Sequence, residues 1–363
     1  MTSLADLTTL RVGGEPTRLV EVADTADLVD AVHEVRASGD DLVVLGGGSN
    51  TLAADGPLEA TVLRVATRGV ERVPSDDGLV HLRVAAGEPW EDLVARTVDE
   101  GLSGFEALSG IPGSTGASPI QNIGAYGQEV SSTIVSVDFL DEDTDEFVRI
   151  PAANLGLGYR TSVFKQGRRG VVTAVEFALA DEGGASRQVA YPQLAHALGV
   201  ELGARVPVAE VRRSVLELRR AKGMVLDADD PDTTSAGSFF TNPVVSRSFA
   251  AGLPADAPRW ATEPEPADVV VPLGEEPAAP PPPTEGRVKL SAAWLIEHAG
   301  VRRGFALPGS RAAVSSKHTL ALTNRGGATA DEVAQLARFV QSRVAAEFGV
   351  VLHPEPVLVG FSL

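Results

Sequence analysis

Two glycine-rich stretches contain the residues best suited to hold a ligand along the backbone. The first, Gly46, Gly47, Gly48, Ser49 and Asn50, directly follows a run of aliphatic residues. Glycine lets a ligand approach the main chain closely, and successive backbone amides form a concave site for an anion. The stretch has neither the Gly-Lys-Ser/Thr of a P-loop nor the Gly-x-Gly-x-x-Gly dinucleotide fingerprint. Taken alone, it is consistent with a phosphate site and equally with a tight structural turn.

The second stretch, residues 111–127, is more informative. It holds two prolines, four glycines, three hydroxyl residues and the adjacent amides Gln121 and Asn122. Small residues permit contact with an extended ligand, while hydroxyl and amide groups satisfy its polar edges. This composition favours a bound cofactor over the simpler alternative, an Ω-loop whose turns satisfy their own hydrogen bonds.

Short strands and amphipathic helices must position these loops. Apolar periodicity predicts a helix that begins at a Thr25 cap and ends at Gly39, followed by a buried strand over 41–45. Thr329 and Glu332 have the spacing of a capping box at the start of a late helix. Helices alternating with β-branched runs predict α/β or α+β layers. Further helices and one strand are predicted over 89–101, 208–221, 329–349 and 356–361.

Composition narrows the range of functions. The 363-residue chain carries 31 Lys and Arg against 49 Asp and Glu, a formal net charge of -18. It lacks the basic excess of a nucleic-acid binder, although a small anionic substrate needs only a few local cations. No cysteine is present, and the six histidines show no metal-ligand spacing, so no metal site is expected. Without a signal peptide or a membrane-spanning apolar run, we expect a cytoplasmic protein that does not insert into membranes.

Residues 251–285 interrupt the pattern of helices and strands. The segment holds ten of the 24 prolines and several acidic residues, with Arg259 as its only basic residue. Such a sequence buries too little apolar surface to offset the entropy lost on ordering. It is predicted to be a mobile surface loop inserted into a folded domain.

Several motifs point to a known family. Residues 9–14 and the two glycine stretches, in this order, resemble the FAD-binding half of vanillyl-alcohol-oxidase-type flavoproteins. Three further motifs, at 158–165, 236–243 and 352–355, are similar to those of the UDP-N-acetylenolpyruvoylglucosamine reductase family. The most specific is Gly-Ser-Phe-Phe-x-Asn-Pro within 236–243. The resemblance covers the whole chain except 251–285.

The resemblance implies an α+β protein that joins an FAD-binding fold of the vanillyl-alcohol-oxidase type to a separate α/β substrate-binding domain. Residues 1–70 and 349–363 would form a first FAD-binding subdomain and 71–227 a second. Residues 228–348 would form the substrate-binding domain, which contains the insert. Tyr191 resembles the substrate-capping tyrosine of the longer subclass, in which the C-terminal tail returns to the first domain.

The resemblance also implies a reaction. FAD would bind non-covalently and NADPH would be the co-substrate; a cysteine-linked flavin is excluded because the chain has no cysteine. The chain would reduce UDP-N-acetylglucosamine enolpyruvate to UDP-N-acetylmuramate for peptidoglycan, acting as a monomer. The FAD-contacting positions would be Gly46, Gly47, Gly48, Ser49, Asn50, Ser114, Thr115, Gly116, Ala117, Gln121, Asn122, Gly124 and Ala125.

Three catalytic residues carry over from the family motifs. Arg160 would face the enolate that develops on the substrate, because a guanidinium is always charged and grips a carboxylate with two donors. Glu355 would lie on the same side of that intermediate, and Ser238 would deliver a proton to the carbanionic carbon. Outside the motifs, the simpler interpretations are a surface ion pair, a solvated carboxylate and a turn serine.

Substrate-binding positions carry over from the same motifs. Lys222 would lie near the substrate diphosphate, although a lysine after a helix also stabilises the helix C-terminus. The other positions are Tyr126, Tyr191, Asn242 and Lys317, with His318 beside the last.

The terminal motif departs most from the family pattern, because His353 replaces an acidic residue and Pro356 directly follows Glu355. Two other functions stay open on the sequence. One is a flavin-dependent oxidase of the same fold, and the other is a UDP-sugar-binding relative that has lost turnover. The Gly-Ser-Phe-Phe-x-Asn-Pro motif argues against the oxidase, and the joint presence of Arg160, Ser238 and Glu355 argues against the binding protein.

Overall fold

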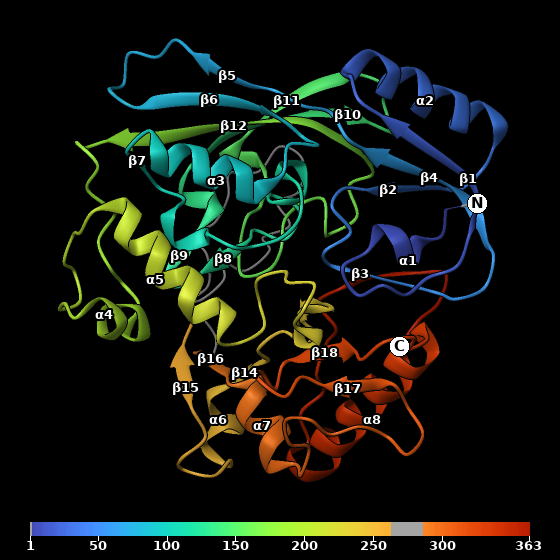
Figure 1. Ribbon diagram of the computed structural model, residues 1–363, viewed down its shortest axis with the longest axis vertical. Helices are drawn as coiled ribbons and strands as arrows, with labels where there is room; N and C mark the ends of the chain where they lie inside the picture. Colours follow the sequence, from blue (N-terminus) through green and yellow to red (C-terminus); the bar gives the residue numbers. More distant parts are fainter. Residues whose placement is uncertain (1, 263–285) are drawn as a thin grey trace, which may run out of the picture.

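The computed structural model describes residues 2–262 and 286–363. Its N-terminal part is a small parallel sheet of order β1-β4-β2, with α2 packed against it (Figure 1). β2 ends at Leu45 and delivers the chain into the first glycine stretch. The elements of this part are α1 (Leu4–Leu7), β1 (Pro16–Val22), α2 (Thr25–Ser38), β2 (Leu42–Leu45), β3 (Thr51–Ala53) and β4 (Leu58–Val65).

The predicted boundaries of α2 need one correction. The helix ends as expected at Gly39, which adopts a left-handed φ of 76°. Its N-cap, however, is Asp24 and not Thr25, because the Asp24 carboxylate accepts the Asp27 N–H at 2.9 Å. Both residue types cap helices well, so local propensity could not distinguish them.

The middle of the chain forms a larger antiparallel sheet of order β11-β10-β12-β6-β5. Trp90 and Phe105 pack edge to face at 4.9 Å, and Phe105 meets Phe177 in the same way at 5.0 Å. This aromatic cluster fixes α3 beneath the sheet, with α5 alongside (Figure 1). The elements are β5 (Val70–Val73), β6 (Val80–Ala85), α3 (Trp90–Asp99), β7 (Leu102–Ser103), β8 (Gly124–Ala125), β9 (Gln128–Glu129), β10 (Ile134–Asp141), β11 (Phe147–Pro151), β12 (Gly170–Asp181), α4 (Pro192–Leu198) and α5 (Val208–Arg220).

The C-terminal part contains two small antiparallel sheets, β13-β18-β17 and β14-β16-β15. Phe239 and Phe240 lie in one buried cluster with Leu336 and Val340 of the last helix. That helix has the predicted capping box and the predicted Gly349 end. The elements are β13 (Ser235–Ser238), β14 (Val244–Ser246), α6 (Arg247–Ala251), β15 (Arg259–Ala261), β16 (Arg287–Leu290), α7 (Ala292–His298), β17 (Ala312–Val314), β18 (Ala321–Asn324) and α8 (Ala330–Phe348).

The C-terminal tail connects this part to the N-terminal one. β19 (Val357–Val359) pairs in parallel with β3, and Figure 1 shows the red tail rising from α8 toward the blue N-terminal elements. Just before β19, the Glu355 N–H donates to the Phe239 carbonyl at 2.8 Å. The tail therefore spans from Phe239, just after β13, to the first glycine stretch. The domain boundaries predicted from the sequence, at 1–70 with 349–363, 71–227 and 228–348, remain a proposal.

The interpretation of residues 251–285 as a loop needs correction at its start. Residues 259–261 form β15, which pairs with β16, and Ala257 is buried. The Arg259 guanidinium donates to the carbonyls of Ala250 and Ala257 at 2.7 and 3.1 Å, which ties this turn to α6. Residues 263–285 lie outside the described residues.

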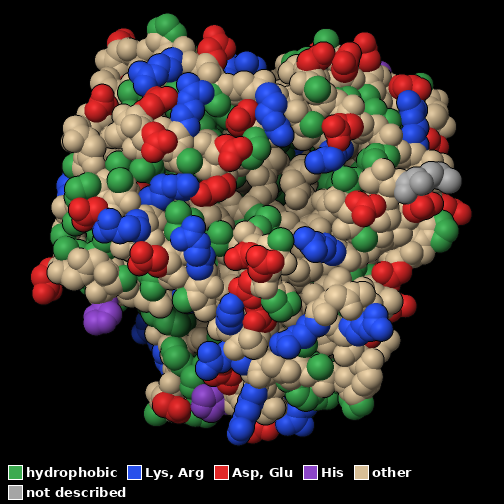
Figure 2. Space-filling model, in the orientation of Figure 1, with side chains coloured by type: hydrophobic (Ala, Val, Ile, Leu, Met, Phe, Trp, Pro, Cys, Tyr) green, Lys and Arg blue, Asp and Glu red, His purple; other side chains and the backbone are tan. Residues whose placement is uncertain are grey.

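The described residues include no helix long and apolar enough to cross a membrane. On the face shown in Figure 2, Lys and Arg side chains alternate with Asp and Glu and form no broad patch of one sign.

Candidate active site

The two glycine stretches pack directly against each other. A Cβ built on Gly47 would lie 2.7 Å from the Gly113 Cα, and one on Gly46 would lie 2.2 Å from the Ser114 Oγ. The Ser49 hydroxyl also donates to the Pro112 carbonyl at 2.9 Å. Glycine is therefore required at these positions for contact between the two loops, a role that the sequence alone did not indicate.

A cavity of about 510 Å³ opens where these loops meet the C-terminal tail and β13, and we call it the glycine-loop cavity. Its walls combine apolar side chains such as Trp90, Ile111 and Phe164 with a few polar groups, as is typical of a ligand site. Most of the predicted cofactor positions line it, namely Gly46, Gly47, Gly48, Ser49, Asn50, Ser114, Ala117, Gln121 and Gly124.

The other four predicted cofactor positions, Thr115, Gly116, Asn122 and Ala125, do not line this cavity. The Thr115 hydroxyl donates to the Glu88 carbonyl at 3.0 Å, and Gly116 packs closely on Ala86. The Asn122 amide donates to the Gly158 carbonyl at 3.0 Å. In this structure these residues shape the loop from behind the cavity wall.

Arg160 is held in the cavity wall by backbone carbonyls of the second glycine stretch. Its Nη1 donates to the Asn122 carbonyl at 3.1 Å and its Nη2 to the Gly124 carbonyl at 2.9 Å. Arg160 has a φ of 55°, a left-handed conformation that is strained for a side chain of this size. Surrounding contacts must compensate for that strain, and they leave Nε free to face the tail.

Glu355 occupies the position opposite that Nε, with its Oε1 at 3.2 Å. Its side chain is only 10% exposed, and burial raises the pKa of the carboxyl while the charges of Arg160 and Lys165 act in the opposite direction. The Glu355 carbonyl accepts from Lys165 Nζ at 3.2 Å and from the Asn50 amide at 3.3 Å. Both the side chain and the backbone of Glu355 therefore belong to the cavity wall.

Ser238 lies at the end of β13, where the strand pairs with Ala321 of β18. It lines the glycine-loop cavity, as do Arg160 and Glu355. Because Glu355 hydrogen-bonds through its N–H to the residue after Ser238, the tail and β13 reach the cavity side by side. The structure thus brings the three predicted catalytic residues to one cavity.

The predicted substrate residues Tyr126, Tyr191 and Lys222 form a separate cluster. The two tyrosine rings pack edge to face at 5.7 Å, and the Lys222 ammonium lies 5.5 Å from the Tyr126 ring centre. Burial, and then the charge of Arg219, lowers the pKa of Lys222. An anion bound here would relieve that charge repulsion.

Asn242, another predicted substrate residue, contacts Tyr159 and the start of α7. Its N–H donates to the Tyr159 hydroxyl at 3.4 Å, while its side-chain oxygen accepts the Ala292 N–H at the start of α7. The Lys289 ammonium lies 4.6 Å from the Tyr159 ring centre. The loop that carries Tyr159 and Arg160 is therefore connected to the C-terminal part through Asn242 and Lys289.

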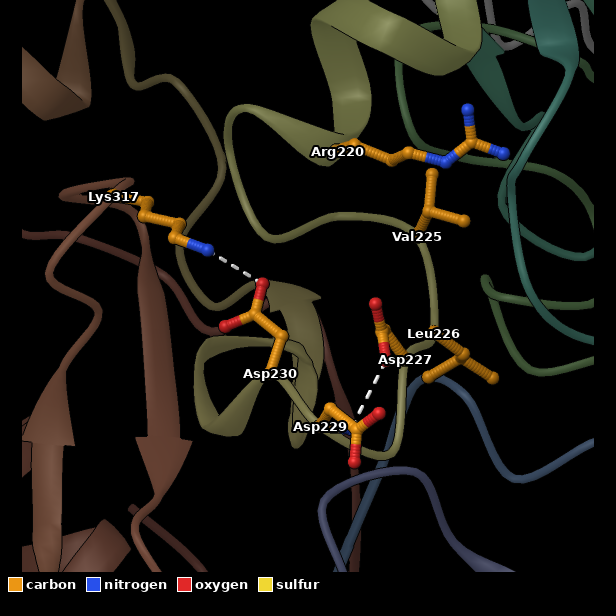
Figure 3. Close-up of a pocket in the computed structure, with 7 residues that line it drawn as sticks. All are labelled: Arg220, Val225, Leu226, Asp227, Asp229, Asp230 and Lys317. Carbon is orange, nitrogen blue, oxygen red and sulfur yellow. Dashed lines mark hydrogen bonds and ion pairs between the residues drawn. The ribbon is translucent and has the colours of Figure 1, made fainter.

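Lys317 does not line the glycine-loop cavity. Figure 3 shows it on a second pocket, of about 600 Å³, with its Nζ 2.6 Å from Asp230 Oδ2. The same pocket is lined by Asp227 and Asp229, so its charge is predominantly acidic. The assignment of Lys317 to the substrate is therefore not supported by its position.

The neighbouring His318 is oriented differently. Burial, together with the cationic side chains of Lys222, Arg219 and Arg303, lowers its pKa to about 4. The adjacent residues Lys317 and His318 thus differ, one forming a surface ion pair and the other a half-buried imidazole on the Lys222 side. Both were predicted to lie near the substrate, and the loop between β17 and β18 directs only His318 to that side.

Sequence reasoning missed Arg219, which lines the glycine-loop cavity from the end of α5. One of its Nη atoms donates to the carbonyls of Gly110 and Met224, at 3.2 and 2.8 Å. Its buried Nε has no hydrogen-bond partner among the described residues. Arg219 is one of many arginines on an amphipathic helix, so no local signal distinguished it.

Two family models match the chain. Residues 16–150 match an FAD binding domain, and residues 229–359 match the C-terminal domain of UDP-N-acetylenolpyruvoylglucosamine reductase. With the mixed helices and strands, these matches confirm the α+β class and an FAD-binding fold joined to a separate second domain.

Curated relatives that match nearly the whole chain are named UDP-N-acetylenolpyruvoylglucosamine reductase. A UDP-N-acetylenolpyruvoylglucosamine reductase of Leifsonia xyli is 60% identical, with 99% of each chain covered. One from Saccharopolyspora erythraea is 51% identical over 99% of this chain and 95% of its own. The crystal structure of the Thermus caldophilus enzyme matches with a TM-score of 0.61 at 26% identity, covering 98% of this chain and 97% of its own. The chain therefore belongs to the UDP-N-acetylenolpyruvoylglucosamine reductase family.

Proposed function

We propose that this chain reduces UDP-N-acetylglucosamine enolpyruvate to UDP-N-acetylmuramate, with bound FAD and with NADPH as co-substrate. The observation that carries the proposal is the meeting of Arg160, Glu355 and Ser238 at the glycine-loop cavity. The full-length similarity to reductases of this name supports the same reaction. We further propose a cytoplasmic monomer whose product serves cell-wall biogenesis, and through it cell shape, the cell cycle and cell division.

The residues of the cavity fit a flavin nucleotide. Arg219 lines the cavity and burial lowers its pKa, so an anionic ligand there would stabilise its charged form. The cavity also has apolar walls for a flat ring and glycine backbone for a diphosphate. The chemistry that FAD supplies when bound is hydride transfer, first from NADPH and then to the enolpyruvyl group.

Arg160 and Glu355 would hold the charge that develops on the substrate. An enolate forms next to the substrate carboxylate as the hydride arrives, and a preorganised guanidinium stabilises that charge without rearranging. Arg160 is preorganised because two carbonyls and Glu355 already fix its three nitrogens. Burial raises the pKa of the Glu355 carboxyl, which would lie on the same side of the intermediate as the Arg160 guanidinium.

Ser238 would then deliver the proton that completes the reduction. A hydroxyl is a weak acid, so it serves this role only where neighbouring groups stabilise the alkoxide or replace the proton. Ser238 lines the cavity that also holds the cations Arg160, Lys165 and Arg219. Their positive charge would lower the cost of forming the alkoxide.

The cluster of Tyr126, Tyr191 and Lys222 would bind the diphosphate of the UDP-sugar. It would bind the diphosphate of NADPH in the other half-reaction. Lys222 is already destabilised as a cation by burial and by Arg219, so a bound diphosphate would offset an existing repulsion. Tyr126 and Tyr191 would cover the bound chain of phosphates from the α4 side.

An anaerobic spectral experiment tests this function. The flavin of the purified protein is bleached with NADPH, the enolpyruvyl UDP-sugar is added, and the visible spectrum is recorded. Rapid recovery of oxidised flavin, with UDP-N-acetylmuramate formed, is the expected result. Recovery only after oxygen is admitted would favour the oxidase alternative. UDP-sugar binding by a protein that takes up no flavin would favour the non-catalytic one.

A further inference from the structure

Glu91, in the first turn of α3, connects the second glycine stretch to α5. Its Oε2 accepts the Gly110 N–H, and its Oε1 lies 2.6 Å from Nη2 of Arg212. Gly110 immediately precedes Ile111, where the cavity lining begins. Glu91 itself does not line the glycine-loop cavity.

Gly110 is also the residue against which Arg219 rests. Its carbonyl accepts from an Nη of Arg219 at 3.2 Å, so Glu91 and Arg219 hold the two successive peptide groups that flank the Gly110 Cα, one through its N–H and the other through its carbonyl. Gly110 has a φ of +75°, and an added Cβ would lie 2.9 and 3.0 Å from Leu216 and Val225. This packing leaves Gly110 little freedom to move without moving Arg219.

Glu91 also places a negative charge near the Arg219 guanidinium. The Arg219 guanidinium is desolvated, which lowers its pKa, whereas the nearby Glu91 carboxylate acts in the opposite direction. A buried arginine without such a neighbour is costly to keep charged.

We propose that Glu91 is a positioning residue for FAD binding: through its hydrogen bond to Gly110 and its own negative charge, it holds Arg219 in place at the glycine-loop cavity. This inference rests on the proposed binding of FAD there. Glu91 would touch neither cofactor nor substrate.

Substitution by glutamine isolates this role. Both carboxylate oxygens of Glu91 accept hydrogen bonds, whereas a glutamine amide has one accepting oxygen and an NH₂ that only donates. In either orientation, Glu91→Gln therefore loses the contact with Gly110 or with Arg212. A matched control is Glu100→Gln at the other end of α3. Glu100 also uses both oxygens, toward Arg72 and Arg96 at 2.7 and 2.9 Å, but makes no hydrogen bond to Gly110 or Arg219 within the described residues.

The test measures the dissociation constant of FAD from the holoenzyme by flavin fluorescence on dilution. We expect Glu91→Gln to weaken FAD binding about tenfold, the scale of one lost hydrogen bond to a charged group, with Glu100→Gln unchanged. In an Arg219→Gln background the same change should add at most about twofold, because coupled residues are not additive. Arg212→Gln should weaken FAD binding in the same direction as Glu91→Gln.

Several results would overturn the proposal. They are unchanged FAD affinity in Glu91→Gln, an equal loss in Glu100→Gln, and independent multiplication of the Glu91 and Arg219 effects. If Glu91→Gln lowers the melting temperature of the apoprotein more than the control does, the FAD affinity of Arg212→Gln distinguishes the proposal from a loss of stability. Unchanged FAD affinity in Arg212→Gln rejects the proposal. Failure of the wild-type protein to bind FAD would instead reject the proposed function.

Discussion

Arg160 Nε and Glu355 Oε1 lie 3.2 Å apart, although one residue comes from the loop before β12 and the other from the C-terminal tail. Three contacts fix the guanidinium, two hydrogen bonds to carbonyls of the second glycine stretch and one ion pair with this carboxyl. The pair therefore depends on the correct assembly of three separate segments, and its geometry leads to the first prediction.

Replacing Arg160 by lysine should abolish most turnover while FAD stays bound. A lysine ammonium cannot reach two carbonyls and a carboxyl from one rigid fork, so the preorganised charge is lost. Loss of one such donor typically lowers kcat by about 10² to 10³, and steady-state kinetics will measure it. Arg168→Lys, whose guanidinium pairs with Asp141 outside the cavity, is the control and should keep near-wild-type kcat. A near-wild-type kcat in Arg160→Lys would remove the residue from the mechanism.

Ser238→Ala should separate the two half-reactions. Flavin bleaching by NADPH requires no proton from this hydroxyl, so its rate should remain nearly unchanged. Reoxidation by the enolpyruvyl substrate should slow by about 10² to 10⁴, the usual contribution of a positioned acid. Stopped-flow absorbance follows both steps, with Ser75→Ala in an exposed turn as the control. Equal slowing of the two steps would contradict the proton-donor role.

Local elements could be predicted because their signals are local. The Thr329 and Glu332 capping box, the Gly349 end of α8 and the strand before the first glycine stretch all follow from neighbouring residues. β15 could not be predicted in this way. Its proline-rich surroundings indicate a loop, and only pairing with β16 makes residues 259–261 a strand.

The sequence predicted which residues belong to the site, but not the contacts that each of them makes. The motifs indicated Arg160, Ser238 and Glu355, yet gave no reason to expect that Asn122 would serve Arg160 through its carbonyl and not line the cavity. The conformation of the loop between β17 and β18 separated His318 from Lys317, and helix packing alone brought Arg219 to the cavity. Such roles depend on contacts between residues far apart in the sequence.

His81 should make the stability of the protein depend on pH. Its two ring nitrogens lie 2.9 Å from carboxylates of Glu176 and Asp77, and the hydrogen bond to Glu176 is the largest cause that raises its pKa. A raised folded-state pKa means that the stabilisation is fully present below the unfolded value, about 6.5. It is lost as pH rises through the folded value.

The melting-temperature difference between wild type and His81→Gln should therefore be larger at pH 5.5 than at pH 9. Differential scanning fluorimetry of both proteins across this range measures it. His33→Gln provides the control, because His33 and Asp145 form an exposed pair, which typically contributes little. A difference that stays constant with pH would show that protonation of His81 is not coupled to folding.

Gly47→Ala should loosen the contact between the two glycine stretches. The new Cβ would lie 2.7 Å from the Gly113 Cα, and backbone at that distance can yield only if one loop shifts. Overpacking of this kind typically lowers the free energy of unfolding by about 1–3 kcal/mol, which urea denaturation of the apoprotein will detect. FAD affinity should fall as well, since both stretches line the cavity. Gly56→Ala is the matched control, because a Cβ there meets nothing within 4 Å. If Gly47→Ala matched that control in both measurements, the loop-to-loop contact would not be what requires glycine at this position.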